Sequence, residues 1–426
     1  MLRRSAFLAP LLLLTAGAVA CSAPSSDDGS TGGEDAITSN DATPLQLEFK
    51  GEVITRGDDT ARKAIAAQVM YLQGALTTGV RGNGQTGMPT LTNIREEAQG
   101  DKKKITYEAA LAVAWPKGRA VPQSYTVVVP KDVTGLSAFN AKYDGKCGNN
   151  EYGQETFWHD WNPSASGCTI DDADVVKATA SVAPHPQATE GKYPEYDQIW
   201  ADDSLDIVAV FGIISSNTPE DEGARTREQL LREVSSSLTG AQRTETQTAG
   251  AIADSTVAGK VTIDGREKSV SITALLVQEA SSAPASFFTR YEAVTKKADL
   301  IVYEGHSGLG KNINALARNT GVTAGKYQLV YLYGCQTLAY LEPTMHEKRI
   351  ALNGAERDPE GTKYLDIIAN ALPAYGDNGR STTDLYRTVL KPGASPKTFN
   401  QLIDPISTGG LVVVFGEHDN TFRPGR

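Results

Sequence analysis

The chain has 426 residues, with 41 Lys or Arg against 51 Asp or Glu, so its formal net charge at pH 7 is −10. This acidic balance argues against nucleic-acid binding, which depends on clustered positive charge. The length exceeds what one hydrophobic core usually serves, and we therefore expect two domains.

Residues 1–20 have the pattern of a signal peptide. Arginines near the N-terminus precede an apolar stretch over residues 6–19, which is too short to span a bilayer comfortably. The junction Ala18-Val19-Ala20-Cys21 resembles a bacterial lipobox, which predicts a lipidated Cys21 as the mature N-terminus. The same letters satisfy the A-x-A rule of ordinary cleavage, so soluble secretion is the alternative.

The segment after the lipidation site is polar. Residues 21–44 are rich in Ser, Gly, Asp and Thr, and such a segment cannot bury enough surface to become ordered. We expect a disordered tether that joins the protein to a lipid membrane. Ser22 directly after Cys21 resembles the pattern sorted to the outer membrane of a Gram-negative bacterium.

A smaller α+β or β-rich domain is expected over residues 45–200. Residues 58–76 carry apolar side chains at helical spacing, which predicts an amphipathic helix. No catalytic constellation is visible in this part. Strand-like runs lie over 45–54, 105–115, 124–130 and 175–182.

Two of the four cysteines, Cys147 and Cys168, flank a loop rich in Gly, Asn, Trp and Pro. In an oxidising compartment this spacing predicts a local disulfide. A metal site with His159 and Asp160 is the alternative, but no CxxC or HxxxH spacing supports it. Cys335 is then left unpaired.

The chain from 201 to 426 predicts an α/β domain with a mostly parallel sheet flanked by helices, because buried strands alternate with helices. Strands are expected over 206–214, 269–277, 299–305, 327–334 and 410–418, and helices over 220–238, 287–298, 311–321 and 361–372.

Two of these strands run directly into reactive side chains. The strand at 299–305 leads into His306, and the strand at 327–334 leads into Cys335. One crossover helix fits between them, so the strands should be parallel and neighbouring, with both side chains at the carboxyl edge where ligands bind. Histidine beside cysteine is a catalytic dyad, since imidazole accepts the thiol proton and the thiolate is the nucleophile.

The segments VYEGHSG and VYLYGCQT resemble the caspase-like cysteine peptidases (clan CD), the group of caspases, legumains, gingipains and clostripain-like enzymes. The resemblance covers about residues 204–400, and only these two segments match closely. It implies a peptide or protein substrate, His306 as general base or acid, and Cys335 as nucleophile. It also implies a pocket below Cys335 that selects the residue before the cleaved bond.

The oxyanion donors implied by the resemblance are the backbone amides of Ser307, Gly308 and Cys335. The group usually has glycine directly after the histidine, whereas this chain has Ser307 and places Gly308 one residue later. Serine offers the same N–H group, but it reaches positive φ only at a cost.

Two other functions fit the same segments. Residues 305–309 match the serine-hydrolase motif G-x-S-x-G except at Leu309, with Ser307 as nucleophile, His418 as base and Asp366 or Asp377 as the acid. A catalytically inactive caspase-like surface protein that binds peptides or partner proteins is the third hypothesis.

We expect no cofactor. Carboxylates cluster in two turn-like segments, but neither has the spacing of a calcium-binding EF-hand loop. A structural calcium ion, which some caspase-like peptidases bind, is therefore supported by no motif. These residues are Asp171, Asp172, Asp174, Asp377, Asn378 and Asp384.

Overall fold

The structure is a computed structural model, and it describes residues 38–79, 84–85, 89–150, 153–186, 188–341, 344–374, 380–390, 395–406 and 411–425. The expected signal peptide, Cys21, the first part of the expected tether, Asp377 and Asn378 lie outside the described residues. Within these ranges, no helix combines the length and the apolar character that crossing a membrane requires.

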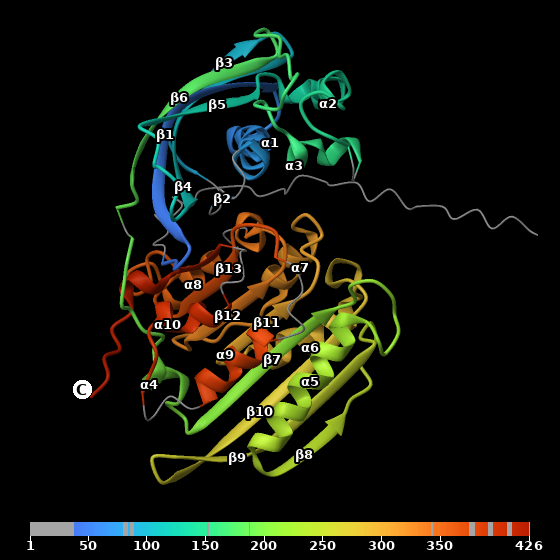
Figure 1. Cartoon of the computed structure of the whole chain (residues 1–426), viewed down its shortest axis with the longest axis vertical. Coiled ribbons are helices and arrows are strands. Elements are labelled where there is room, and N and C mark those ends of the chain that lie inside the picture. Colours follow the sequence, from blue (N-terminus) through green and yellow to red (C-terminus); the bar gives the residue numbers. More distant parts are fainter. Residues whose placement is uncertain are drawn as a thin grey trace, which may run out of the picture.

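The first sheet is antiparallel and has six strands in the order β2-β4-β1-β6-β5, with β3 also paired to β4. It curves around helix α1 (Figure 1). Its elements, which we call the N-terminal module, are β1 (Ala42–Arg56), α1 (Ala61–Gly74), β2 (Gly84–Gln85), β3 (Thr90–Gln99), β4 (Lys102–Pro116), β5 (Ser124–Pro130), α2 (Leu136–Tyr143), α3 (Phe157–Asp160) and β6 (Val175–Pro184).

Helix α1 forms where the helical pattern predicted it. Thr60 caps its start by accepting a hydrogen bond from the Lys63 amide at 3.3 Å. Its apolar stripe, which includes Ile65, Val69 and Leu72, is buried. The stripe packs against the concave face of the sheet and thereby forms the core of the N-terminal module.

The second sheet has eight strands in the order β14-β13-β12-β11-β7-β10-β9-β8. Its elements form what we call the α/β module, after the short connecting helix α4 (Tyr196–Ile199). They are β7 (Ser204–Gly212), α5 (Glu222–Ser237), β8 (Thr239–Glu245), β9 (Ala253–Ile263), β10 (Arg266–Val277), α6 (Ala285–Thr295), β11 (Leu300–Glu304), α7 (Lys311–Asn319), β12 (Gln328–Tyr333), α8 (Thr344–Asn353), β13 (Leu365–Asn370), α9 (Arg380–Leu390), α10 (Phe399–Ile403) and β14 (Val412–Phe415).

Short helical turns complete the described elements. One of them, η5, directly follows Cys335 and Gln336. They are the π-type turn η1 (Ala75–Gly79) and the 3-10 turns η2 (Val133–Gly135), η3 (Gln154–Thr156), η4 (Ala280–Ser282), η5 (Thr337–Tyr340), η6 (Asp404–Ile406) and η7 (Glu417–Asp419).

The α/β class is confirmed, but the second sheet is mixed. Strands β10, β7, β11, β12 and β13 are parallel, while β14, β9 and β8 pair with their neighbours in the antiparallel direction. The sequence analysis missed β8 and β9. Strands β9 and β10 are joined by Asp264 and Gly265, both at positive φ (51° and 75°), the geometry of a two-residue Asp-Gly hairpin.

The predicted helix over 361–372 is wrong. This segment contains strand β13, which is buried along its whole length between β12 and β14. A strand covered on both faces shows a continuous apolar run, and such a run has no periodicity that separates it from a buried helix.

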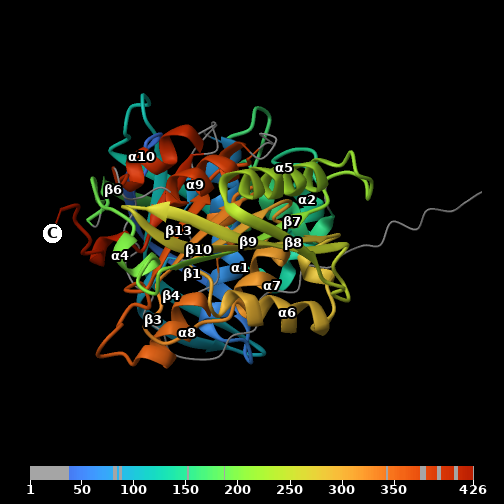
Figure 2. The same ribbon diagram turned by 90° about the horizontal axis from the view of Figure 1, so that it is seen from below.

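Two apolar clusters lie on opposite faces of the second sheet, which Figure 2 shows with helices on both sides. One cluster contains side chains of α5, α9 and α10. The other includes side chains of α6 and α7 and continues into the first sheet and α1. The two modules therefore share a continuous apolar core.

Part of the expected tether is ordered. Thr38 is buried, its backbone pairs with that of Val414 in β14, and its hydroxyl donates a hydrogen bond to Glu417 at 2.6 Å. Strand β1 then begins at Ala42. Residues 38–44 thus belong to the folded part, because backbone pairing and buried hydroxyl contacts satisfy a segment whose composition alone predicts disorder.

The predicted disulfide between Cys147 and Cys168 is confirmed, with 4.8 Å between the two Cα atoms. A disulfide of this kind fits an oxidising compartment. It encloses the loop that carries α3, whose Phe157 and Trp158 side chains are buried.

Replacing Cys147 and Cys168 together by Ala should lower the free energy of unfolding by about 3 kcal/mol, because a closed loop of about twenty residues restricts the unfolded chain by that amount. Urea unfolding followed by circular dichroism measures the change. Equal unfolding free energies for the two proteins would contradict this expectation.

Candidate active site

Three neighbouring parallel strands, β7, β11 and β12, reach glycine at or just past their carboxyl ends: Gly212, Gly305 and Gly334. The Gly305 amide donates a hydrogen bond to the Tyr333 carbonyl at 3.1 Å. A Cβ atom built on Gly334 would lie 2.6 Å from the Gly305 carbonyl oxygen, so this close approach excludes a larger residue.

The two predicted catalytic residues follow the paired ends of β11 and β12. Strands β11 and β12 pair from Leu300 opposite Leu329 to Glu304 opposite Tyr333. His306 and Cys335 each lie two residues further on, at matched positions of strands that run about 4.8 Å apart. Both residues therefore follow the carboxyl ends of neighbouring strands, and their side-chain contacts lie on the two outer sides of this pair: His306 contacts Ile214 after β7, and Cys335 contacts Ala374 after β13.

The hydrogen bonds of His306 define its tautomer. Its side chain is exposed, and its Nε2 atom lies 2.9 Å from the Ile214 carbonyl oxygen in the loop after β7. A carbonyl oxygen only accepts hydrogen bonds, so Nε2 carries a proton, and in the neutral ring Nδ1 holds the basic lone pair. The backbone carbonyl of His306 accepts hydrogen bonds from the Tyr303 hydroxyl at 2.6 Å and from Asn312 Nδ2 at 2.8 Å.

Asp221 holds the loop that carries Ile214. This buried carboxylate caps α5 by accepting a hydrogen bond from the Gly223 amide at 2.9 Å. It also accepts from the amides of Ile214, Ser215 and Ser216 at 2.8 to 3.1 Å. Burial alone would raise the pKa of Asp221, but these four amide donors outweigh it, and the pKa lies below its ordinary value.

Cys335 is the free cysteine of the described residues, and it is half-buried. Its thiol donates a long hydrogen bond to the Ala374 carbonyl, with 3.6 Å between sulfur and oxygen. Burial raises the pKa of this thiol, because the thiolate loses hydration. The resting side chain is therefore a neutral thiol, which reacts as a nucleophile only after a base has removed its proton.

The turn after His306 accommodates Ser307 without left-handed strain. The residues with positive φ are Gly308 (61°), Leu309 (51°) and Gly310 (94°), and Ser307 is not among them. The Ser307 amide nitrogen would lie 3.6 Å from a Cβ atom on Gly334, which places it beside the end of β12. The backbone N–H of Ser307 thus lies next to the end of β12, two residues before Cys335.

The structure does not assemble the alternative serine triad. Asp366 lies at the amino end of β13, opposite Leu329, whereas Ser307 follows the carboxyl end of β11. At about 3.3 Å per residue, this separates Asp366 from the carboxyl edge by about 20 Å along the strand.

The described candidates for the acid and the base of the serine triad have other hydrogen-bond partners. Asp366 accepts a hydrogen bond from the Tyr327 hydroxyl, and the other described candidate, His418, binds Glu360 through Nε2 at 2.8 Å. Asp377 lies outside the described residues.

The alternative metal site also lacks support. His159 contacts Asp160 through Nδ1 at 3.1 Å and Gln336 through Nε2 at 3.0 Å, so both ring nitrogens have protein partners. In the described part of the chain, no group of three or more His, Cys, Asp and Glu side chains is placed to hold a metal ion. The turn carboxylates that are described pair with basic residues instead: Asp171 and Asp174 with Lys142, Asp172 with Lys177, and Asp384 with Arg380 and Arg387.

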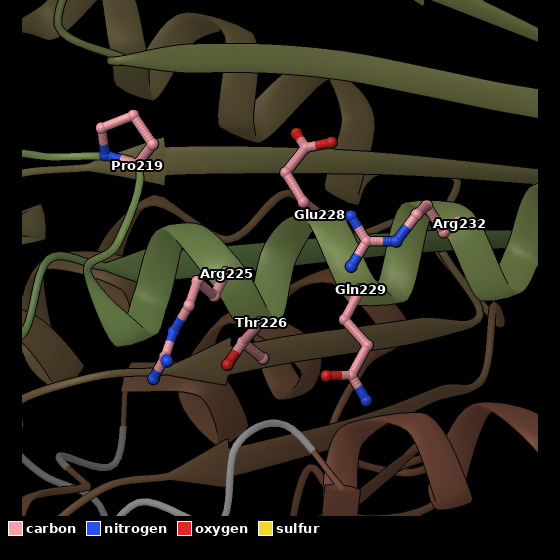
Figure 3. Close-up of a pocket in the computed structure, with 6 residues that line it drawn as sticks. All are labelled: Pro219, Arg225, Thr226, Glu228, Gln229 and Arg232. Carbon is pink, nitrogen blue, oxygen red and sulfur yellow. The ribbon is translucent and has the colours of Figure 1, made fainter.

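A hollow on the surface of α5, with a volume of about 340 Å³, lies elsewhere (Figure 3). Its described lining includes neither His306 nor Cys335. The lining residues are Pro219, Arg225, Thr226, Glu228, Gln229 and Arg232.

Sequence reasoning missed three residues of this site. Ile214 acts through a backbone carbonyl, which leaves no side-chain signal. Asp221 has the sequence position of a helix cap, and the acids at the start of the predicted helix over 220–238 were its only signal. Gln336 has a positive φ of 50° and a fully buried side chain, and nothing in its sequence neighbourhood indicates either property.

The chain matches no protein-family model, and no curated protein sequence is significantly similar to it. The site is therefore interpreted from its own geometry.

Alkylation of the Cys335 peptide by iodoacetamide should increase with pH and reach its midpoint above the ordinary thiol value of about 8.5. The reason is that burial raises the pKa of this thiol, and only the thiolate reacts. Mass spectrometry of the peptide that carries Cys335 measures the rate at each pH. A midpoint near neutral pH would instead indicate a preformed thiolate–imidazolium pair.

Asp221→Asn should reduce the free energy of unfolding at pH 7 by about 1–3 kcal/mol, because the amide cannot accept as many backbone hydrogen bonds. The pKa of Asp221 is lowered in the folded state, so its stabilising contribution is present above the unfolded pKa and is lost as pH falls through the folded pKa. Urea unfolding at pH 7 and at pH 3 should therefore show a smaller difference for the variant than for the wild type. Parallel pH profiles would contradict this role.

Proposed function

We propose that the protein is a caspase-like cysteine peptidase that hydrolyses peptide bonds through Cys335 and His306. The observation that carries this proposal is that His306 and Cys335 each follow the carboxyl end of one of two neighbouring parallel strands. The resemblance to the caspase-like cysteine peptidases implies the same arrangement, with reactive residues after two parallel core strands.

The neutral Cys335 thiol supports general-base catalysis. His306 Nδ1 accepts the thiol proton while Nε2 donates to the Ile214 carbonyl, which keeps the ring in place. The sulfur attacks the carbonyl carbon of the scissile bond, and the resulting oxyanion accepts hydrogen bonds from the amides of Ser307, Gly308 and Cys335.

The proton balance closes over two half-reactions. In the first, His306 returns the proton to the leaving amine, and a thioester forms between Cys335 and the acyl half of the substrate. In the second, water gives a proton to His306 and its hydroxide equivalent attacks the thioester. Collapse of this intermediate releases the carboxylic acid and restores the thiol.

We also propose that the protein is exported and held at an outer membrane by lipidated Cys21, with soluble secretion as the alternative. The disulfide between Cys147 and Cys168 supports an oxidising compartment. A peptide or protein outside the cytoplasm is then the substrate class.

A positional-scanning library of fluorogenic peptides tests the hydrolase. The wild type should cleave a subset of peptides and react with a thiol-directed acyloxymethyl ketone, and Cys335→Ala should abolish both. His306→Ala should lower kcat by about 10²–10⁴-fold, the usual contribution of a general base.

His418→Ala is the matched control, because it removes a half-buried histidine from the opposite end of the sheet and should leave turnover unchanged. Labelling of Ser307 by a fluorophosphonate, with turnover retained in Cys335→Ala, would establish the serine mechanism instead. Failure of both probes together with peptide binding would indicate the inactive binding protein.

A further inference from the structure

The N-terminal module reaches the turn that follows Cys335. His159 Nε2 lies 3.0 Å from Gln336 Oε1, and Gln336 Nε2 donates to the Thr77 hydroxyl at 3.1 Å. The rings of Trp158 and Tyr340 also meet edge to face, with centroids 6.2 Å apart. Residues far apart in the chain therefore meet one position beyond the candidate nucleophile.

Gln336 needs these partners. Its backbone has φ 50°, a left-handed conformation that costs a non-glycine residue about 1–2 kcal/mol, and its side chain is fully buried. Within the α/β module, its amide donates to the Leu372 carbonyl at 3.1 Å and its Oε1 accepts from the Tyr340 hydroxyl at 3.1 Å. His159 and Thr77 add one contact to the carbonyl oxygen and one to the amino group of this side chain.

The position of His159 depends on close backbone packing around α3. A Cβ atom on Gly74, at the end of α1, would lie 2.0 Å from the Trp158 carbonyl oxygen. A Cβ atom on Gly148, next to Cys147, would lie 2.6 Å from the Asp160 carbonyl oxygen. Helix α3 is thus held between the end of α1 and the disulfide.

The disulfide is connected to α3 through a backbone hydrogen bond of Cys147. The Cys147 carbonyl accepts a hydrogen bond from the Asn162 amide at 2.7 Å, just beyond the end of α3. Cys147 is itself completely buried. The covalent link to Cys168 therefore restrains the segment that presents His159 to the turn after Cys335.

We propose that the disulfide-closed loop of the N-terminal module is a positioning element for Cys335, acting through His159 and Gln336. The loop holds Gln336 in its left-handed backbone conformation. It thereby sets the orientation of the Cys335 side chain just past the end of β12. This inference rests on the proposed hydrolase for its catalytic meaning, but the positioning of the thiol is measurable without any substrate.

His159→Leu keeps the bulk of the ring and removes the contact with Gln336, whereas His159→Gln retains a donor. With the turn released, the thiol becomes less buried and its pKa falls. We therefore expect Cys335 in His159→Leu to be alkylated by iodoacetamide about tenfold faster at pH 7.5 than in the wild type, with a lower pH midpoint. His159→Gln should lie between the two.

The matched control is His185→Leu, which replaces another buried histidine, directly after β6. It should alkylate like the wild type. The double variant Cys147→Ala with Cys168→Ala should shift the rate in the same direction as His159→Leu. If His159→Leu does not fold, Thr77→Val tests the same turn from η1, and near-UV circular dichroism identifies the folded variants.

Turnover of a cleaved peptide supplies the catalytic readout. In His159→Leu, kcat should fall by about tenfold or more while KM stays nearly constant, because misplacement of a reacting group affects the chemical step. Alkylation rate and pH midpoint equal to those of the wild type, in a folded His159→Leu protein, would overturn the positioning role. A changed rate in a protein that hydrolyses no peptide would keep the positioning and overturn the hydrolase.

Discussion

The parallel pairing of β11 with β12 is the constraint on which the candidate site depends. It sets Glu304 opposite Tyr333, two residues before His306 and Cys335, and a slip by one residue would send every side chain of the strand to the other face. The close approach at Gly305 and Gly334 leaves no room for a side chain where the strands end. The backbone register thus determines which residues follow the two neighbouring strand ends.

Burial keeps the Cys335 thiol neutral at rest, while His306 donates a hydrogen bond from Nε2 to the Ile214 carbonyl. Elsewhere in the sheet, burial has a comparable effect on carboxyl groups: it raises the pKa of Asp299, just before β11, to about 7, against the opposing influence of Lys326.

What could be predicted from the sequence was local. An apolar run that ends in a reactive residue predicted both strand ends, and two cysteines flanking a polar loop predicted the disulfide. Strand β13 was mistaken for a helix because a doubly buried segment has no amphipathic period. The Asp264-Gly265 pair, by contrast, is a local hairpin signal that the sequence contains. The contact between His159 and Gln336 joins residues 177 positions apart, and no local pattern predicts such a contact.

The continuous apolar core between the modules has a consequence for biosynthesis. The N-terminal half emerges from the ribosome first, yet one side of its core is completed by residues such as Leu338 and Leu372, which are made much later. Until those residues are synthesised, this apolar surface is exposed to water and prone to aggregation. The same holds for any chain whose core joins residues far apart in the sequence. A fragment cut near residue 200 would keep this apolar surface exposed to water.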